Sequence, residues 1–399
     1  MKYMMFLLLL LMSVIVFSEN ILPESTYTVG VITHYSTATE HVFNDAKKML
    51  DEYLEYGQIL FLQSATEATS NVYVELYLGY DATNNIYKAT YIDGNYKVTS
   101  QYSPGGFKKY STFLKEIIYY PLEKIALYRF KTGDFGKYLR LTYHPGVDEY
   151  GDYSPEKGLF FFITDRLAGN RNIAYMNFSD TTINILAVFG SSEYFPKLSP
   201  DGSTILFQGS LHGFWNIYTM PFSPDYYKKI RLVSSGNKPA YGPTWYDENT
   251  VLYSQDTKTK NEMLMKSLKG NFVKPLKTYG EMSFTPFVHN GEIYYTALHG
   301  ANFGIYKLVD GTNTVVEDTF FNEHDPVVTP DGSYLVFTSN RDGIYRIWMK
   351  DLSTGSVTCL TPDIPYDVFY PETDGKYVFF SVYKEGEEPD IYVRRLERK

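Results

Sequence analysis

The chain has 399 residues, of which 44% are hydrophobic, 17% aromatic and 21% charged. This length allows two domains with cores of their own, and the composition is that of a globular protein rich in half-buried strands. The net charge of −9 argues against a nucleic-acid partner, and the single cysteine, Cys359, excludes an intrachain disulfide or a cluster of cysteine ligands.

The N-terminus carries the pattern of an export signal. An apolar run extends from Met4 to Phe17, and Val16 and Ser18 are small enough to precede a cleavage site before Glu19. The run is short for a membrane span, although an uncleaved anchor stays open as the alternative. No cysteine follows the run to carry a lipid. Residues 1–18 therefore predict a signal peptide and an exported protein.

Residues 22–128 predict a small domain of mixed strands and helices. Tyr27 to Thr33 has the composition of a first strand, and apolar residues at helical intervals predict a helix that Gly57 stops. Three more strands are expected at 59–62, 72–78 and 86–91. A second helix, marked by apolar residues from Phe107 to Ile118, is expected to end or kink at Pro121.

From residue 137 onward one motif recurs. Its clearest copy, Asp325–Met349, contains the turn Thr-Pro-Asp-Gly, the strand Leu335–Phe337, the turn Asn-Arg-Asp-Gly and the strand Tyr345–Trp348. Six copies follow one another at steps of 44, 47, 42, 41 and 43 residues, marked by the turn residues Gly158, Gly202, Asn249, Gly291, Gly332 and Gly375. Such a period with several short strands is typical of propeller blades, because one small sheet cannot bury both its faces alone. The sequence predicts a six-bladed β-propeller over residues 137–399.

The last repeat lacks an outer strand of its own. Only six residues follow Ile391–Val393. The segment Tyr138–Thr142, just before the first repeat, resembles the fourth strands of other copies, such as Ile230–Val233. We expect residues 138–142 to complete the sixth blade and so to remove the open edges of the ring.

The order of these parts resembles the TolB family of periplasmic propeller proteins. The resemblance rests on an export signal, a small α/β domain and WD40-like repeats with Ser-Pro-Asp-Gly turns, of which Asp201-Gly202 and Asp331-Gly332 are the clearest. It implies a non-enzymatic periplasmic scaffold of the Tol-Pal envelope-maintenance system. The propeller would bind a Pal-like lipoprotein at its channel mouth, and the N-terminal domain would contact inner-membrane Tol components. Similar repeats occur in propellers fused to serine peptidases, so the motif indicates architecture better than activity.

No catalytic constellation stands out in the sequence. It contains no Gly-x-Ser-x-Gly elbow, no His-Glu-x-x-His motif and no Gly-rich phosphate loop in a nucleotide-binding context. The seven histidines are scattered along the chain. We therefore expect no enzymatic activity, no cofactor and no metal.

The competing class is a ligand-binding propeller, or one that processes glycans or peptides with acidic residues at its channel. Four carboxylates lie near the expected blade entrances: Glu193, Glu323, Asp325 and Asp367. An enzyme would form a deep pocket with two or more converging acids or a metal, whereas a scaffold would expose a broad aromatic rim without strongly perturbed titratable groups.

One recurring sequence pattern does indicate a candidate binding surface. Five copies have an aromatic or imidazole residue two positions before the proline of the innermost strand, and counting back from the first turn adds a tyrosine. The six are Tyr150, Tyr194, Tyr241, Phe284, His324 and Phe369. Innermost strands surround the channel of a propeller, so these residues are expected to border one end of it. They would form either a partner-binding rim of rigid aromatics or the packing between neighbouring blades.

Overall fold

The computed structural model describes residues 28–50, 58–67, 70–94, 96–167, 169–187, 189–235, 237–257, 260–270, 272–280 and 282–397. The chain divides into two compact units, Met1–Leu139 and Arg140–Lys399. The expected signal peptide, residues 1–18, lies outside the described residues. Within the described ranges, none of the helices has the length and apolar character needed to span a membrane.

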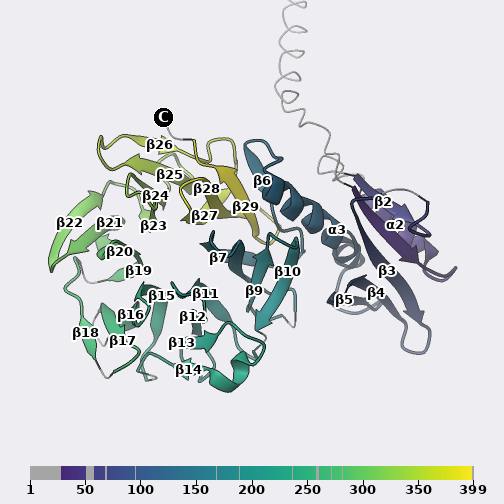
Figure 1. The fold of residues 1–399 in the computed structure, drawn as a ribbon, viewed down its shortest axis with the longest axis horizontal. Coiled ribbons are helices and arrows are strands. Elements are labelled where there is room, and N and C mark those ends of the chain that lie inside the picture. Colours follow the sequence, from purple (N-terminus) through teal and green to yellow (C-terminus); the bar gives the residue numbers. More distant parts are fainter. Residues whose placement is uncertain are drawn as a thin grey trace, which may run out of the picture. The chain divides into compact units, whose positions relative to one another are not determined.

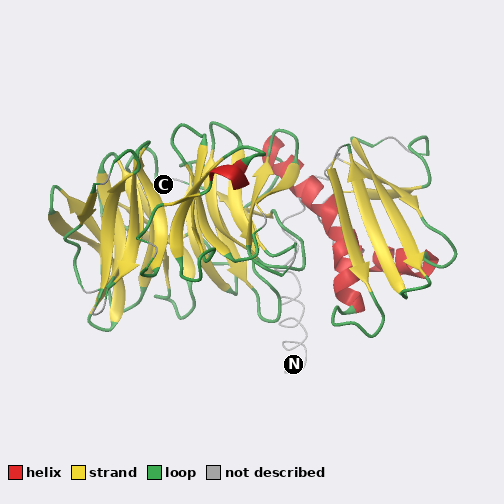
Figure 2. Ribbon diagram, turned by 90° about the horizontal axis from the view of Figure 1, so that it is seen from below, coloured by secondary structure: helices red, strands yellow, loops and turns green. Residues whose placement is uncertain are grey.

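The first unit is a five-stranded sheet in the order β2-β1-β3-β4-β5 with two helices (Figure 2). Its elements are β1 (Thr28–His34), α2 (Glu40–Leu50), β2 (Gln58–Leu62), β3 (Val72–Asp81), β4 (Ile86–Asp93), β5 (Tyr96–Tyr102) and α3 (Tyr110–Thr132). β1 pairs in parallel with β2 and β3, and the other pairs are antiparallel. Alternate residues such as Val29, Val31 and Leu76 are fully buried, because both helices pack on one face of the sheet.

Helix α3 does not end at Pro121 but continues to Thr132, so of the two outcomes expected at this proline, an end or a kink, the end is wrong. Proline has no N–H to donate to the carbonyl of Ile117, four residues earlier. The hydroxyl of Tyr91 in β4 donates to that carbonyl instead, so the bond that the proline removes is replaced from the sheet. The helix ends at Gly133, whose left-handed φ of 70° lets its N–H cap the last turn.

The second unit is a six-bladed β-propeller in which each blade is a four-stranded antiparallel sheet. Figure 1 shows the six sheets in a ring, with the first strand of each blade nearest the centre. Blade 1 consists of β7 (Asp148–Ser154), β8 (Leu159–Thr164), β9 (Asn172–Asn177) and β10 (Thr182–Ala187). Blade 2 consists of β11 (Glu193–Leu198), β12 (Thr204–Gly209), β13 (Asn216–Pro221) and β14 (Arg231–Leu232), with a short 3-10 helix η2 (Tyr226–Lys229). Blade 3 consists of β15 (Ala240–Asp247), β16 (Thr250–Asp256), β17 (Asn261–Ser267) and β18 (Val273–Pro275).

Blade 4 consists of β19 (Ser283–His289), β20 (Glu292–His299), β21 (Asn302–Val309) and β22 (Thr312–Glu317). Blade 5 consists of β23 (Glu323–Val328), β24 (Tyr334–Ser339), β25 (Arg346–Asp351) and β26 (Val357–Cys359). Blade 6 consists of β27 (Asp367–Thr373), β28 (Tyr377–Tyr383), β29 (Asp390–Arg395) and β6 (Tyr138–Arg140). The last of these strands precedes all the others in the chain. It occupies the outer position that the repeat pattern leaves open in the sixth blade.

The closing segment is held by backbone bonds and by a buried ion pair. The N–H of Leu141 donates to the carbonyl of Ile391 over 2.8 Å, and the N–H of Ile391 donates to Oγ1 of Thr142 over 2.9 Å. Beside them the Arg140 guanidinium lies 2.7 Å from the Asp390 carboxylate, and both side chains are mostly buried. Sequence-distant ends of the propeller are thereby joined in one sheet.

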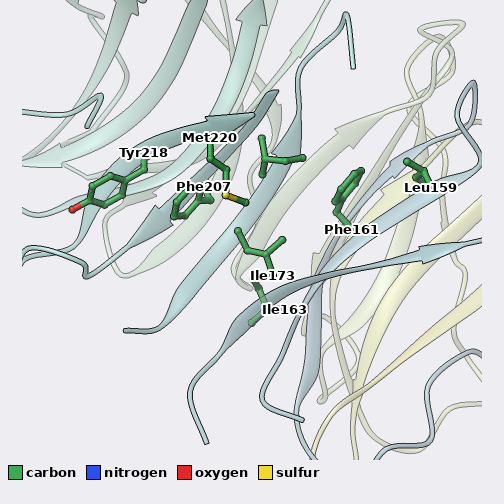
Figure 3. Close-up of a cluster of buried hydrophobic side chains, with 8 residues drawn as sticks. Leu159, Phe161, Ile163, Ile173, Phe207, Tyr218 and Met220 are labelled. Atoms are coloured by element: carbon green, nitrogen blue, oxygen red, sulfur yellow. The ribbon is translucent and has the colours of Figure 1, made fainter. Parts of the chain in front are cut away.

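Apolar side chains fill the space between neighbouring blades. Between blades 1 and 2 a cluster buries eight residues, seven of which are labelled in Figure 3: Leu159, Phe161, Ile163, Ile173, Phe207, Tyr218 and Met220. The second strands contribute to both neighbouring interfaces, since Ile205 and Phe207 pack towards blade 1 and Leu206 packs towards blade 3. This explains why these strands are continuously apolar and do not alternate with polar residues.

Candidate functional site

Strand pairing defines two ends of the propeller. In blade 2 Glu193 pairs with Gly209, and Gly209 pairs with Asn216. The start of the first strand, the end of the second and the start of the third therefore lie side by side. We call this the entry end, because the loops that lead into each blade lie here. The turn glycines, such as Gly202, lie at the opposite end.

Each innermost strand has a β-bulge at the same place. One residue in each bulge has a left-handed φ, between 44° and 57°: Tyr150, Phe195, Gly242, Thr285, Asp325 and Tyr370. A bulge changes the direction in which side chains point. These six residues and their neighbours line a cavity of about 70 Å³ in the channel, to which all six blades contribute.

Five of the six expected ring residues immediately precede the left-handed residue of their blade, and they are Tyr194, Tyr241, Phe284, His324 and Phe369. In blade 1 this position holds Glu149, which pairs with Ile163 before the bulge as Tyr194 pairs with Gln208. The assignment of Tyr150 is therefore wrong by one position. The turn has the same length in blades 1 and 2, but Gly158 comes four residues after Ser154, whereas Gly202 comes three residues after Ser199. A count back from the glycine therefore slips by one residue. Tyr150 lies in the cavity instead.

The ring side chains are partly buried, and most of them have aromatic contacts within or between blades. The Phe303 ring lies 6.3 Å from Phe284 in its own blade and 5.7 Å from His324 in the next. Tyr345 repeats this arrangement, 5.4 Å from His324 and 4.7 Å from Phe369. The ring is therefore neither a fully exposed rim nor a closed core.

Exposed apolar residues gather at the entry end. Among the described residues of the second unit, eleven large hydrophobic side chains are exposed, and seven of them lie on entry-end loops: Leu167, Phe214, Tyr279, Met282, Phe320, Phe321 and Tyr366. Phe320 is 93% exposed. Groups of exposed apolar side chains mark interaction sites more often than chance allows. These residues have no signature in the sequence, because loops carry no periodic pattern.

Three charged side chains from blades 1, 2 and 6 meet at the channel. Nζ of Lys197 lies 3.0 Å from Oδ1 of Asp152 and 3.0 Å from Oε2 of Glu372. Burial lowers the pKa of Lys197, but the two carboxylates outweigh burial and raise it. Burial also raises the pKa of Glu372, and Lys197 opposes this effect. The lysine thus links three blades through one charged cluster.

The four entrance carboxylates do not form an acid pair. Glu323 lies 3.2 Å from the Arg341 guanidinium, and Asp367 accepts a 2.9 Å hydrogen bond from the N–H of Tyr345. Asp325 lines the cavity, and burial raises its pKa although His324 acts in the opposite direction. The described residues contain no group of three or more His, Cys, Asp or Glu side chains placed to hold a metal ion.

Glu193 is fully buried without a cation. Oε1 accepts a 2.9 Å hydrogen bond from Ser191, but Oε2 has no hydrogen-bond partner among the described residues. The equivalent carboxylate of blade 5, Glu323, has Arg341 beside it, whereas Leu211 takes that arginine's place in blade 2. Burial therefore raises the pKa of Glu193 to about 8, with Ser191 opposing the shift.

We expect Glu193→Gln to remove a pH dependence of stability. Burial raises the pKa of Glu193 in the folded protein above the ordinary carboxyl value of 4.5. The folded state is therefore most stable below about pH 4.5, and this stability is lost as the pH rises through about 8. The variant should melt like the parent at acid pH and a few degrees higher under alkaline conditions, as measured by thermal unfolding across pH. Glu262→Gln, which changes a partly exposed carboxylate, serves as the control. Equal melting temperatures at alkaline pH would contradict the assignment.

Comparisons with known proteins find similarity in fold. A TolB protein of Agrobacterium tumefaciens is 16% identical, with a TM-score of 0.49 over 64% of this chain and 92% of that one. TolB of Acinetobacter baumannii is 12% identical, with a TM-score of 0.35 over 94% and 95%. An oligogalacturonate lyase of Vibrio parahaemolyticus is 11% identical, with a TM-score of 0.45 over 65% and 94%. No family model and no curated protein match the chain. The chain is similar in fold to TolB structures, and also to an oligogalacturonate lyase.

Proposed function

We propose that this protein is a non-enzymatic scaffold that binds a partner protein at the entry end of its propeller. The proposal rests on the exposed apolar side chains of the entry-end loops, which lie at the same end of the propeller as the ring of half-buried aromatics. Rigid aromatic side chains give a large contact area at a small cost in entropy. The channel cavity of about 70 Å³ is far smaller than the roughly 300–1,000 Å³ of ordinary ligand pockets, which favours surface recognition.

The biological setting of this proposal comes from the sequence. The apolar run of residues 4–17 supports export, and the order of domains and repeats supports a TolB-like role in the periplasm. The partner would be an envelope protein such as a Pal-like lipoprotein, and the N-terminal unit would contact inner-membrane Tol components. The net charge of −9 makes a nucleic-acid partner unfavourable.

A second candidate is a ligand-binding propeller, or one that processes glycans or peptides. It is favoured by two carboxylates that line the cavity, Asp325 and Glu372. The two candidates place the recognition surface differently. A scaffold depends on the exposed loop residues, whereas a small-ligand site depends on the cavity alone.

Variants of the exposed loops test the proposal. Phe214→Ser and Phe320→Ser are each expected to weaken capture of an envelope partner by about 1–2 kcal/mol, because exposed aromatic anchors dominate such contacts. Their melting temperatures should not change, since these side chains are 52% and 93% exposed. Phe272→Ser is the matched control, as Phe272 is 54% exposed but follows the third strand of blade 3, at the opposite end. Full capture by both loop variants would overturn the proposal.

The same assay decides the role of the ring. If Tyr194 and Tyr241 belong to the partner site, replacing either by alanine weakens capture by about 1–2 kcal/mol and leaves the melting temperature unchanged. If they are packing between blades, alanine costs about 3 kcal/mol or more of stability through the cavity it leaves. Capture and thermal unfolding are to be measured on the same variants.

A further inference from the structure

We propose that the channel cavity binds the end of a primary alkylammonium, the group that a lysine side chain or an N-terminal amine presents. This inference rests on the proposed function, because it names the chemical group of the partner that enters the channel. It is carried by three properties of the cavity: its aromatic wall, its unbalanced negative charge and its size.

The first property is the aromatic wall. The Tyr150 ring lies 4.0 Å from the Tyr370 ring and 4.5 Å from the Phe195 ring, so three adjacent blades place aromatic groups together in the cavity. The corresponding positions of blades 3 and 4 hold Gly242, which has no side chain, and Thr285, whose side chain is small, so they leave space in the channel. Aromatic rings attract organic cations through their quadrupoles, and this attraction strengthens where water is excluded.

The second property is the charge. Of three carboxylates here, those of Asp152 and Glu372 pair with the Lys197 ammonium, whereas that of Asp325 lines the same cavity as Lys197 and Glu372 without pairing with the lysine. This group of side chains is therefore short of positive charge. Lys197 pairs with the first two and shows that the channel can hold an ammonium at hydrogen-bond distance from carboxylates. Asp325 has no ion pair among the described residues, and its φ of 54° belongs to the bulge that lines the cavity.

The third property is the size. A cavity of about 70 Å³ has room for roughly five or six water-sized groups. This is enough for an ammonium with a short alkyl stem, but not for a large aromatic side chain. A neutral group would leave the Asp325 carboxylate partly desolvated without a compensating charge, which is unfavourable.

The test uses the full chain and n-propylammonium chloride as the probe. Binding is measured by saturation-transfer NMR titration, with 1-propanol as the neutral analogue of the same shape and with ionic strength held constant by sodium chloride. We expect saturable binding of n-propylammonium and binding of 1-propanol that is at least about tenfold weaker, the factor expected when a charged contact is lost. Equal binding of the two probes, or no saturable binding of n-propylammonium, would overturn the inference.

Two variants locate the site. Asp325→Asn should weaken n-propylammonium binding at least about tenfold, whereas Asp310→Asn should leave it unchanged. Asp310 is a matched control because it is an exposed aspartate that also has a left-handed φ, of 48°. Asparagine accepts this backbone conformation as readily as aspartate does. Unchanged binding by folded Asp325→Asn would overturn the inference. If that variant does not fold, the comparison of the two probes on the parent chain decides.

The outcomes for this inference and for the proposed function are separable. An envelope partner captured by a chain that does not bind n-propylammonium would overturn the inference alone. Binding of n-propylammonium by a chain that captures no envelope protein would support the inference and overturn the proposed function.

Discussion

Replacing residues 137–143 by a glycine-serine linker of the same length is expected to unfold the last blade of the propeller. The change removes Leu139 and Leu141, which are 3% and 0% exposed, and it leaves Asp390 buried without Arg140. Each lost leucine costs about 2–5 kcal/mol. The total loss in the free energy of unfolding, on the order of 5–10 kcal/mol, is comparable with the whole stability of many domains, about 5–15 kcal/mol.

Urea unfolding of the parent chain and of the variant with residues 137–143 replaced measures this loss of stability. The control replaces the exposed residues 385–388, in the loop between β28 and β29 of the same blade, by the same kind of linker. The control should unfold like the parent, because it removes no buried side chain. An unchanged unfolding midpoint for the 137–143 variant would show that β6 does not hold the ring closed.

A second large loss of folding stability is expected for Lys197→Met. This change keeps the length of the side chain but leaves Asp152 and Glu372 facing each other without a cation. Removing one member of a buried ion pair costs about 3–5 kcal/mol, because the remaining charge is left uncompensated. The loss should be smaller at acid pH, because burial raises the pKa of Glu372 and protonation of this residue removes one of the two facing charges.

Two further variants identify the cause of this loss. Glu372→Gln combined with Lys197→Met should recover part of the stability, because it removes one of the unpaired charges. Lys260→Met should cost no more than about 1 kcal/mol, since Lys260 pairs with Glu262 at the surface. A Lys197→Met protein that unfolds at the same urea concentration as Lys260→Met would contradict the account of the charged cluster.

The repeat could be predicted because each blade has its own local turn chemistry. Gly202 and Gly332 adopt φ values of 71° and 73°, as the Ser-Pro-Asp-Gly and Thr-Pro-Asp-Gly turns predict. The closing strand could be predicted because the sixth repeat leaves an unpaired edge and Tyr138–Thr142 resembles the fourth strands of the other copies. Both inferences depend on signals that are local or periodic in the sequence.

The channel could not be predicted in the same way. Residues such as Tyr150, Phe195 and Tyr370 rarely adopt a left-handed φ, so their bulges have no local sequence signature. The cluster of Lys197 and Glu372 joins residues 175 positions apart in the chain, and only the closed ring brings them together. The stop expected at Pro121 failed for a similar reason, because the replacing hydrogen bond comes from Tyr91 in a strand.

Site-specific photo-cross-linking tests the proposed partner surface most directly. The photoreactive residue p-benzoylphenylalanine would take the place of Phe320 at the entry end or of Phe272 at the opposite end, both of which are exposed. Cross-linking in envelope extract, followed by mass spectrometry, would identify the partner and its position. We predict a defined cross-linked envelope protein from position 320 and none from position 272. No cross-link from position 320, or the same products from both positions, would contradict it.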